Sequence, residues 1–394
     1  MTEKNAKPQL RFAGFDDTWE QRKFEDIAVR SSSISSESGL PRVEYEDIIS
    51  GTGRLNKDIF AKESDKTGIV FHKGDVLYGK LRPYLQNWLL PSFNGLAVGD
   101  FWVLQPQNAD SSFLYRLIQS RQFDEVANQS TGTKMPRSDW KLVSKTEFFI
   151  PSAIGEQAAI GAYFEQLDNL ITLHQRKYDK LTNVKKSMLE KMFPKNGSNV
   201  PEIRFKGFSD AWEQRKLSEL YEKASRKNDL TYGKYDIISV ANMYFKPDSY
   251  ITDERYLLTY NIFELGDIAF EGNKSKNYAH GRFVENTIGN GIVSHVFDVF
   301  KPIMKPYDLQ FWKYAINNER LMGGILLRST KASTMMTNLV ANDFLQETFL
   351  VPSYPEQQKI GAFFQGLDNL ITLHQRELEK LKNLKKACLE KMFV

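Results

Sequence analysis

The sequence is organised around one helical stretch that occurs twice. Glu156 to Phe193 reads EQAAIGAYFEQLDNLITLHQRKYDKLTNVKKSMLEKMF, and Glu356 to Phe393 reads EQQKIGAFFQGLDNLITLHQRELEKLKNLKKACLEKMF. The two copies align without a gap at an offset of 200, and 26 of 38 positions are identical. Apolar residues recur in each copy at alternating steps of three and four. That spacing predicts two long helices, each with a coiled-coil seam.

Four polar residues interrupt this seam at equivalent places in the two copies: His174, Lys185, His374 and Lys385. A metal-binding or catalytic role would need further ligands or a nucleophile at a suitable spacing, and none is present. Polar residues at such positions set the register of paired helices or contact a partner protein. We predict one of these two roles for all four residues. Lys185 and Lys385 also belong to lysine-rich final turns, with Lys186, Lys191, Lys386 and Lys391, for which complementing the negative helix end and binding phosphate are further alternatives.

A second, shorter repeat precedes each helix. Residues 8–23 read PQLRFAGFDDTWEQRK and residues 201–216 read PEIRFKGFSDAWEQRK, with 11 of 16 positions identical. The segments between the matched ends, Phe24 to Ile150 and Leu217 to Val351, look almost unrelated. A repeated frame around divergent inserts predicts a constant scaffold that presents two variable modules. We therefore place domain boundaries at 1–151, 152–193, 194–200 (a linker), 201–352 and 353–394.

The inserts have the pattern of mixed, mainly β structure. FHKGDVLY (71–78) and FELGDIAF (263–270) each place Gly-Asp before an apolar run, which is typical of a turn followed by a strand. Similar patterns predict strands over 97–104 and 292–300 and helices over 112–128 and 307–320. The predicted fold class is α+β, with two mixed modules, two long helices and an internal repeat.

Composition narrows the possible functions. The 394 residues carry a net charge of +4, so a nucleic-acid partner would depend on local basic faces. The single cysteine, Cys388, excludes an internal disulfide framework and a cysteine-based zinc site. Residues 1–8 are polar and the chain has no membrane-spanning apolar run. We expect a cytoplasmic protein.

No familiar catalytic motif is present. The sequence lacks the phosphate-binding Gly-x-x-x-x-Gly-Lys-Ser/Thr, a glycine-rich dinucleotide or methyl-donor turn, and the Asn/Asp-Pro-Pro-aromatic tetrapeptide of amino-methyltransferases. The five histidines show no metal-ligand spacing. We expect a non-catalytic chain that binds no metal or cofactor itself.

Two pairs of polar loops are candidates for binding DNA. Cations beside hydroxyls, amides and aromatics suit phosphate positioning and base reading. For each loop, an ordinary solvated loop or turn remains an alternative. The candidate residues are Lys80, Arg82 and Tyr84 in one loop, Lys274, Lys276 and Arg282 in its counterpart, and Thr133, Lys134, Arg137 and Thr334 near the ends of the inserts.

The repeated motifs resemble those of the specificity subunits of type I restriction–modification systems. Arg11-Phe-x-Gly-Phe-x-x-x-Trp-Glu-Gln-Arg-Lys opens a variable region, and Pro352-Ser-x-x-Glu-Gln-x-x-Ile-Gly-x-Phe-Phe opens a long helix. Both motifs occur twice, in order, although the first copy of the second motif has one extra residue before Glu156 and has Tyr163 in place of the first phenylalanine. The resemblance implies two target-recognition domains, each reading one half of a split double-stranded DNA site, separated by two helices that pack antiparallel.

The same resemblance implies partners. The helices would dock two modification (methyltransferase) subunits, and restriction (translocase/nuclease) subunits would complete the complex. S-adenosylmethionine, ATP and Mg²⁺ would then bind to those partners. Two other functions remain open: a non-catalytic assembly scaffold whose variable segments bind protein, and a nuclease with unrecognised carboxylates.

Overall fold

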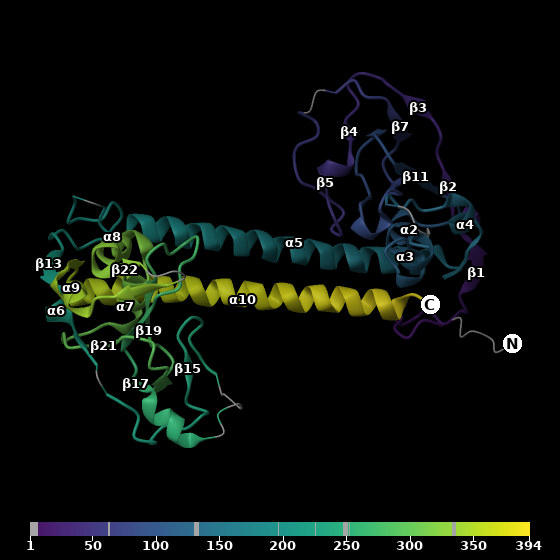
Figure 1. The fold of residues 1–394 in the computed structure, drawn as a ribbon. Coiled ribbons are helices and arrows are strands. Elements are labelled where there is room, and N and C mark those ends of the chain that lie inside the picture. The colour runs from purple at the N-terminus through teal and green to yellow at the C-terminus, as the bar shows by residue number, and fades with distance from the viewer. Residues whose placement is uncertain are drawn as a thin grey trace. The chain divides into compact units, whose positions relative to one another are not determined.

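The structure is a computed structural model that describes residues 7–61, 64–129, 134–195, 197–224, 226–246, 251, 253–332 and 336–394. Thr133 and Thr334 lie outside these residues. The chain divides into two compact units. Unit 1 contains the residues up to Gln175 together with Gln375–Val394, and unit 2 contains Arg176–His374. Two long helices, α5 (Ile154–Lys191) and α10 (Tyr354–Met392), are shared between the units (Figure 1). Each helix has one part in unit 1 and the other part in unit 2.

The first insert, together with β1 of the repeated motif, forms the variable module of unit 1. Its two larger sheets each have four strands, in the orders β2-β11-β8-β9 and β3-β7-β10-β4. Its elements are β1 (Glu20–Lys23), α1 (Phe24–Ile27), β2 (Ala28–Arg30), β3 (Ile34–Ser35), β4 (Arg42–Val43), η1 (Tyr45–Asp47), β5 (Ile48–Ile49), β6 (Arg54–Leu55), β7 (Gly68–Phe71), β8 (Val76–Gly79), η2 (Pro83–Leu85), β9 (Trp88–Leu89), β10 (Gly95–Ala97), β11 (Phe101–Pro106), α2 (Ser111–Leu117), α3 (Arg121–Ala127), α4 (Trp140–Lys145) and β12 (Glu147–Ile150).

The second insert, together with β13 of the repeated motif, forms the variable module of unit 2. Its four-stranded sheet, β14-β21-β18-β19, repeats the strand arrangement of β2-β11-β8-β9. Its elements are β13 (Glu213–Lys216), α6 (Leu217–Leu220), β14 (Tyr221–Lys223), β15 (Ile238–Ser239), β16 (Tyr244–Phe245), η3 (Glu254–Thr259), β17 (Asn261–Phe263), β18 (Ile268–Glu271), β19 (Arg282–Glu285), β20 (Gly291–Val293), β21 (Val299–Pro302), α7 (Leu309–Ile316), α8 (Glu319–Ser329), β22 (Thr330–Ala332), β23 (Thr337–Leu339), α9 (Ala341–Gln346) and β24 (Thr348–Val351).

Four predicted segments are divided in the structure. The strand expected over 292–300 is split into β20 and β21. The strand expected over 97–104 is split into β10 and β11, because Gly99 adopts a positive φ of 102° between them. The helix expected over 112–128 is split into α2 and α3, because the Ser120 hydroxyl accepts the amide of Phe123 and begins a new helix. Asn318 caps α8 in the same way and splits the helix expected over 307–320.

The repeated Trp-Glu-Gln-Arg-Lys motif joins each module to a long helix. Its strand β1 pairs antiparallel with β12, the strand that leads into α5, with Glu20 opposite Ile150. In unit 2, β13 pairs with β24 and Glu213 lies opposite Val351. The two frames therefore close with the same register, which explains why the motif is kept while the inserts diverge.

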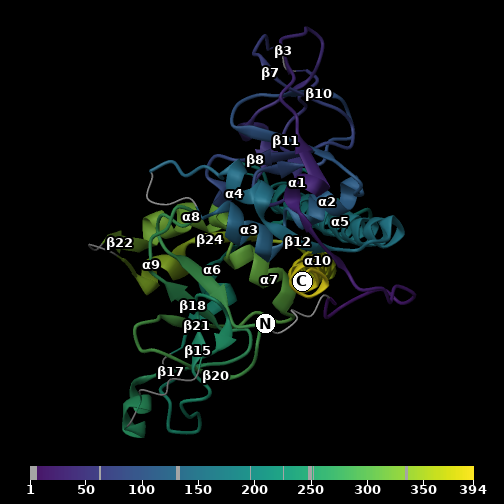
Figure 2. The ribbon, with the colours of Figure 1, turned by 90° about the vertical axis from the view of Figure 1, so that its right-hand side faces the viewer.

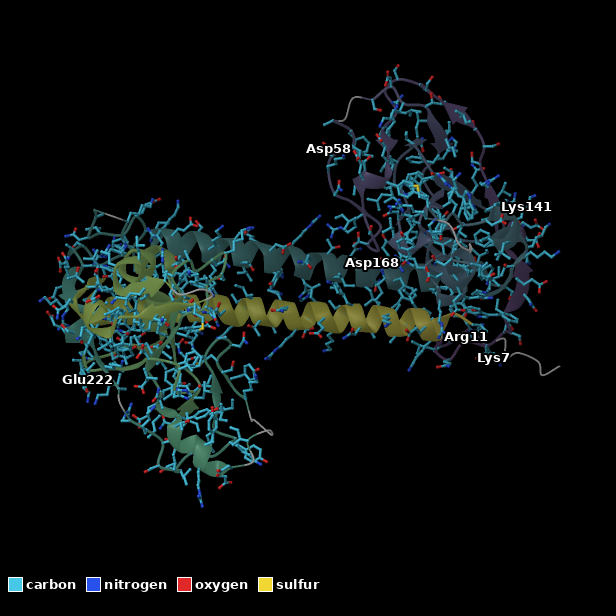
Figure 3. All side chains as sticks on the ribbon, viewed as in Figure 1. Lys7, Arg11, Asp58, Lys141, Asp168 and Glu222 are labelled. Carbon is cyan, nitrogen blue, oxygen red and sulfur yellow. The ribbon has the colours of Figure 1, made fainter. Side chains whose placement is uncertain are left out.

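A buried ion pair fixes the start of each long helix. The Arg11 guanidinium donates two hydrogen bonds, of 2.6 and 2.7 Å, to the Glu156 carboxylate, and Arg204 does the same to Glu356. Both glutamates are fully buried. Trp19 Nε1 also donates to Glu156, at 3.2 Å (Figure 3 labels Arg11). A base-stacking role for this tryptophan is excluded by its burial, because only 3% of its surface is exposed.

The two long helices run antiparallel within each unit. In unit 1, Phe164 of α5 lies against Phe393, while Asp168 lies against Lys385, so the numbers fall along α10 as they rise along α5. In unit 2, Lys185 contacts Asp368, and Phe193 stacks on Phe364. Figure 2 looks along α10. The predicted fold class, including antiparallel long helices and two mixed modules, is confirmed.

A phenylalanine just beyond each long helix enters a module core. Phe393 stacks on Phe113 of α2 in unit 1, and Phe193 stacks on Phe311 of α7 in unit 2. Each module thus packs on the beginning of one long helix and the end of the other. Across the described residues, no helix combines the length and apolar character that crossing a membrane requires.

Candidate nucleic-acid interface

In unit 1 the candidate loops lie side by side. The loop after β8 and the loop before α4 form a short β-bridge between Leu81 and Arg137. The Arg82 amide donates to the Pro136 carbonyl at 2.7 Å, and the Ser138 amide donates to the Lys80 carbonyl at 2.9 Å. The structure therefore brings two of the candidate loops, separated by more than fifty residues in sequence, into one surface.

Two cations of this surface share a carboxylate. Asp100 forms ion pairs with Arg137 at 3.0 Å and with Lys80 at 3.5 Å. The hydrogen bond from Arg137 holds the pKa of Asp100 below its ordinary value. Lys134 is exposed, and 57% of the Tyr84 surface is exposed. The surface offers an aromatic ring and cations that are partly neutralised, which favours short-range contacts over strong long-range attraction.

The counterpart loops in unit 2 are joined in a similar way. Asn273 and Met336 form a β-bridge, and the Thr337 amide donates to the Gly272 carbonyl at 2.8 Å. Lys274 and Lys276 are exposed. The two modules therefore build equivalent two-loop surfaces from unrelated sequences.

Arg282 is less available for contacting DNA than the sequence suggested. Its guanidinium donates to Glu271 at 2.6 Å and lies over the Tyr278 ring, 5.1 Å from the centroid. The Tyr278 hydroxyl in turn donates to Asn317 Oδ1 at 2.6 Å. This chain of contacts orients the loop between β18 and β19.

The seam lysines lie in reciprocal ion pairs between the helices. Lys385 of α10 donates to Asp168 of α5 at 2.7 Å, and Arg116 binds the other oxygen of Asp168 at 2.7 Å. Lys185 of α5 donates to Asp368 of α10 at 2.5 Å. Burial lowers the pKa of Lys385, against the opposing effect of Asp168.

Other parts of the seam differ between the two units. The second oxygen of Asp368 accepts from the Tyr314 hydroxyl at 2.6 Å, where Asp168 has an arginine. His174 and His374 are half-buried on α5 and α10. The roles predicted for these histidines and for the two lysines stay predictions.

Sequence reasoning missed the two aspartates. Asp168 and Asp368 lie within the ten positions, 167–176 and 367–376, that are identical in both copies. That identity was the available signal, but nothing within one helix indicates which residue a charge meets on the other. Arg116 and Tyr314, which come from the divergent inserts, gave no signal.

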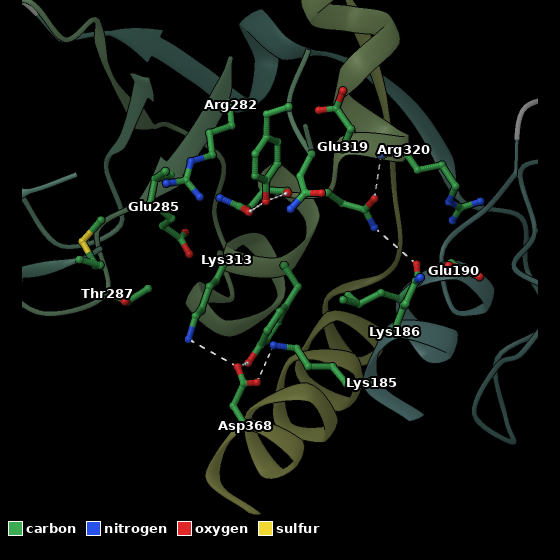
Figure 4. A pocket seen from close by; sticks show the side chains of 18 of the residues that line it. Lys185, Lys186, Glu190, Arg282, Glu285, Thr287, Lys313, Glu319, Arg320 and Asp368 are labelled. Atoms are coloured by element: carbon green, nitrogen blue, oxygen red, sulfur yellow. Dashed lines mark hydrogen bonds and ion pairs between the residues drawn. The ribbon is translucent and has the colours of Figure 1, made fainter. Parts of the chain in front are cut away.

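A groove in each unit lies between the end of a long helix and a variable module. The groove of unit 2 has a volume of about 1170 Å³ and is lined by Lys185, Lys186, Leu189 and Glu190 of α5 (Figure 4). The groove of unit 1, about 590 Å³, is lined by the equivalent residues Lys385, Lys386, Leu389 and Glu390 of α10. The opposite walls come from the inserts. Among the described residues, no group of three or more His, Cys, Asp or Glu side chains has a metal-binding arrangement.

Comparison with known protein families identifies relatives. The family model of the type I restriction modification DNA specificity domain matches residues 16–183 and again residues 209–383. The Type I restriction enzyme EcoDI specificity subunit of Escherichia coli is 26% identical over 204 residues, covering 48% of this chain and 46% of that protein. The MjaVIII specificity subunit of Methanocaldococcus jannaschii is 23% identical over 293 residues, covering 66% and 64%. The chain thus matches about half to two thirds of the length of these relatives.

Solved structures show the same fold. The crystal structure of the type I restriction-modification system S subunit from M. genitalium superposes with a TM-score of 0.56 at 15% identity, covering 98% of this chain and 99% of that one. A chain from a structural study of complex assembly and conformational transition in a type I R-M system gives a TM-score of 0.50 at 16% identity, covering 94% and 96%.

Proposed function

Because the chain belongs to the type I restriction–modification DNA specificity family, we propose that it is the DNA sequence-recognition subunit of such a complex. Each recognition module reads one half of a bipartite double-stranded target. The long helices dock two modification subunits, and restriction subunits join that assembly. The chain itself is not a catalyst, it works in the cytoplasm, and S-adenosylmethionine, ATP and Mg²⁺ bind to its partners.

One observation carries this proposal. The two modules place equivalent two-loop surfaces, around Leu81–Arg137 and Asn273–Met336, on frames that close with the same register. The frames share about two thirds of their residues, whereas the loops differ. A scaffold of constant geometry with changeable loops is what separate reading of two half-sites requires, because the contacts that position a protein on DNA are distinct from those that read its bases. Joining two readers in one chain also makes the second contact intramolecular and raises affinity.

An exchange of one insert tests the proposal. Residues 24–150 are replaced by the corresponding insert of another family member, and the complete system is expressed in cells whose DNA is then sequenced for methylated positions. We expect one half of the methylated motif to change and the other half to stay. An unchanged motif with a normal level of methylation would favour the alternative function, an assembly scaffold whose inserts bind protein.

A further inference from the structure

The grooves of the two units combine a constant wall with a variable one. On the helix side, four residues of α5 at 185, 186, 189 and 190 recur as the same residue types at 385, 386, 389 and 390 of α10. On the module side, the unit 2 groove reaches Tyr278 and Arg282 of a candidate reading loop. The unit 1 groove reaches Gln86, which follows Tyr84 in the equivalent loop. A ligand that binds in both grooves therefore meets the same residue types on the helix side and different residues on the module side.

Adjacent lysines on the constant wall have different surroundings. Lys185 and Lys385 are half-buried and are held by Asp368 and Asp168 of the other helix. Lys186 and Lys386 are exposed and line the grooves, and within the described part of the chain no carboxylate lies within ion-pair distance of either. The first lysine of each pair thus serves the helix pairing, while the second presents its ammonium group to the groove.

Counted over all of its lining residues, the two lysines of the constant wall included, each groove carries more cations than carboxylates. Cations outnumber carboxylates by six to four in the groove of unit 2 and by five to three in that of unit 1. Arg320 is exposed on the module wall of unit 2, and on that of unit 1 Arg121 is 82% exposed and forms an ion pair with Glu125 at 2.6 Å. Each groove can therefore attract an anionic ligand from both walls.

We propose that the grooves hold the DNA backbone beside each half-site, with Lys186 and Lys386 as sequence-independent phosphate contacts. This inference rests on the proposed function and adds a role for the constant helices. DNA matches the two walls, because its phosphates are the same at every site while its bases vary. A modification subunit would match the constant wall, but it would not require continuity with the reading loops.

The test uses the complete complex with its modification subunits. The variant Lys186→Gln/Lys386→Gln is compared with Lys180→Gln/Lys380→Gln, which removes two exposed lysines from equivalent positions of the same helices outside both grooves. Binding is measured by fluorescence anisotropy between 50 and 200 mM salt. One duplex carries the motif that the system methylates, and in a second duplex both half-sites are scrambled.

We expect the groove variant to lower the slope of log affinity against log salt by about 0.9 for each lysine, or about 1.8 in total. Across this salt range the wild type should then lose roughly 12-fold more affinity than the variant. Both duplexes should weaken by the same factor, so that the specificity ratio is unchanged, and the control variant should keep the wild-type slope.

Three results would overturn the inference: an unchanged salt slope, a changed specificity ratio, or loss of the modification subunits from the complex on native mass spectrometry. The last would identify the constant wall as a protein-docking surface. Failure of the proposed function is a separate outcome, because in that case the wild-type complex itself would not distinguish the two duplexes.

Discussion

Glu285 is a buried carboxyl group without a cationic hydrogen-bond partner. It lies at the end of β19, and only 3% of its surface is exposed. The Tyr307 hydroxyl donates to Oε1, and Oε2 has no partner among the described residues. Burial raises the pKa of this group well above its ordinary value, and the hydrogen bond from Tyr307 and the charge of Lys313 oppose this effect. The folded protein therefore holds this proton at a pH where an exposed glutamate has lost it.

Because Glu285 holds this proton, we expect the effect of Glu285→Gln on the free energy of unfolding to depend on pH. The unfolded side chain ionises above about pH 4.5 while the folded one stays protonated, so the wild type loses stability as pH rises through this window. The loss approaches about 1.4 kcal/mol per pH unit until the folded pKa is reached. Glutamine removes the dependence, so the stability of the variant relative to wild type should increase from pH 5 to pH 7 in urea unfolding.

The matched control is Glu271→Gln in the neighbouring strand β18. Glu271 is also buried, but it carries the Arg282 ion pair. Its replacement should destabilise the protein at neutral pH, because it leaves a partly buried guanidinium without its carboxylate. A stability difference between wild type and Glu285→Gln that does not change with pH would contradict the assignment of a protonated Glu285.

Individual residue roles were only partly predictable from the sequence. Lys185 and Lys385 stood out because they interrupt an apolar period. Their partners did not, because a residue on one helix gives no information about its position relative to another helix. Arg282 looked like a free DNA contact, yet Glu271, eleven positions earlier, lies directly opposite it on the paired strand β18. Strand pairing had to be known before this ion pair could be recognised.

At the scale of the elements, the two reciprocal ion pairs predict that removing Lys185 and removing Lys385 destabilise the helix pairing to different extents. Lys385→Met leaves Asp168 with Arg116 at 2.7 Å, whereas Lys185→Met leaves Asp368 with the neutral Tyr314 hydroxyl and with Lys313 at 3.9 Å. Losing a partner of a partly buried charge costs about 1–3 kcal/mol. We expect Lys185→Met to be the more damaging change, because the carboxylate that it leaves has the poorer remaining partners.

Hydrogen exchange can locate this effect, since the amides of α5 and α10 report on each helix end separately. Lys185→Met should accelerate exchange near 185 and 368 more than Lys385→Met does near 385 and 168. Equal acceleration at both ends would show that Arg116 does not compensate for the missing lysine.

Predictability also differed between kinds of element. The long helices could be predicted because their apolar period extends over 38 residues and exists in two copies. The inserts could be assigned to strands and helices, but the breaks at Gly99, Ser120 and Asn318 depend on single residues inside otherwise regular patterns. The sheet order β2-β11-β8-β9 joins strands distant in sequence, and no local pattern specifies such pairing.

For the whole molecule, the proposed function predicts that the length of the two long helices sets the distance between the two half-sites. Asp168–Lys385 lies in unit 1 and Lys185–Asp368 lies in unit 2, and both helices continue between these pairs. Inserting the same four residues after Arg176 and after Arg376 lengthens each helix by about 6 Å, slightly more than one turn. Because the insertions match, both ion pairs can still form.

We expect this double insertion to lengthen the unread spacer of the methylated motif by one or two base pairs, since base pairs are about 3.4 Å apart. Both half-site sequences should stay the same, because the modules are untouched. Sequencing of methylated genomic DNA measures the spacer and the half-sites together. The same four residues inserted after Gly197, in the loop that follows α5, should leave the spacer unchanged. If the spacer stays constant in the helix variant while methylation continues, the helix length does not set it, and the distance between the half-sites must be fixed by the partner subunits.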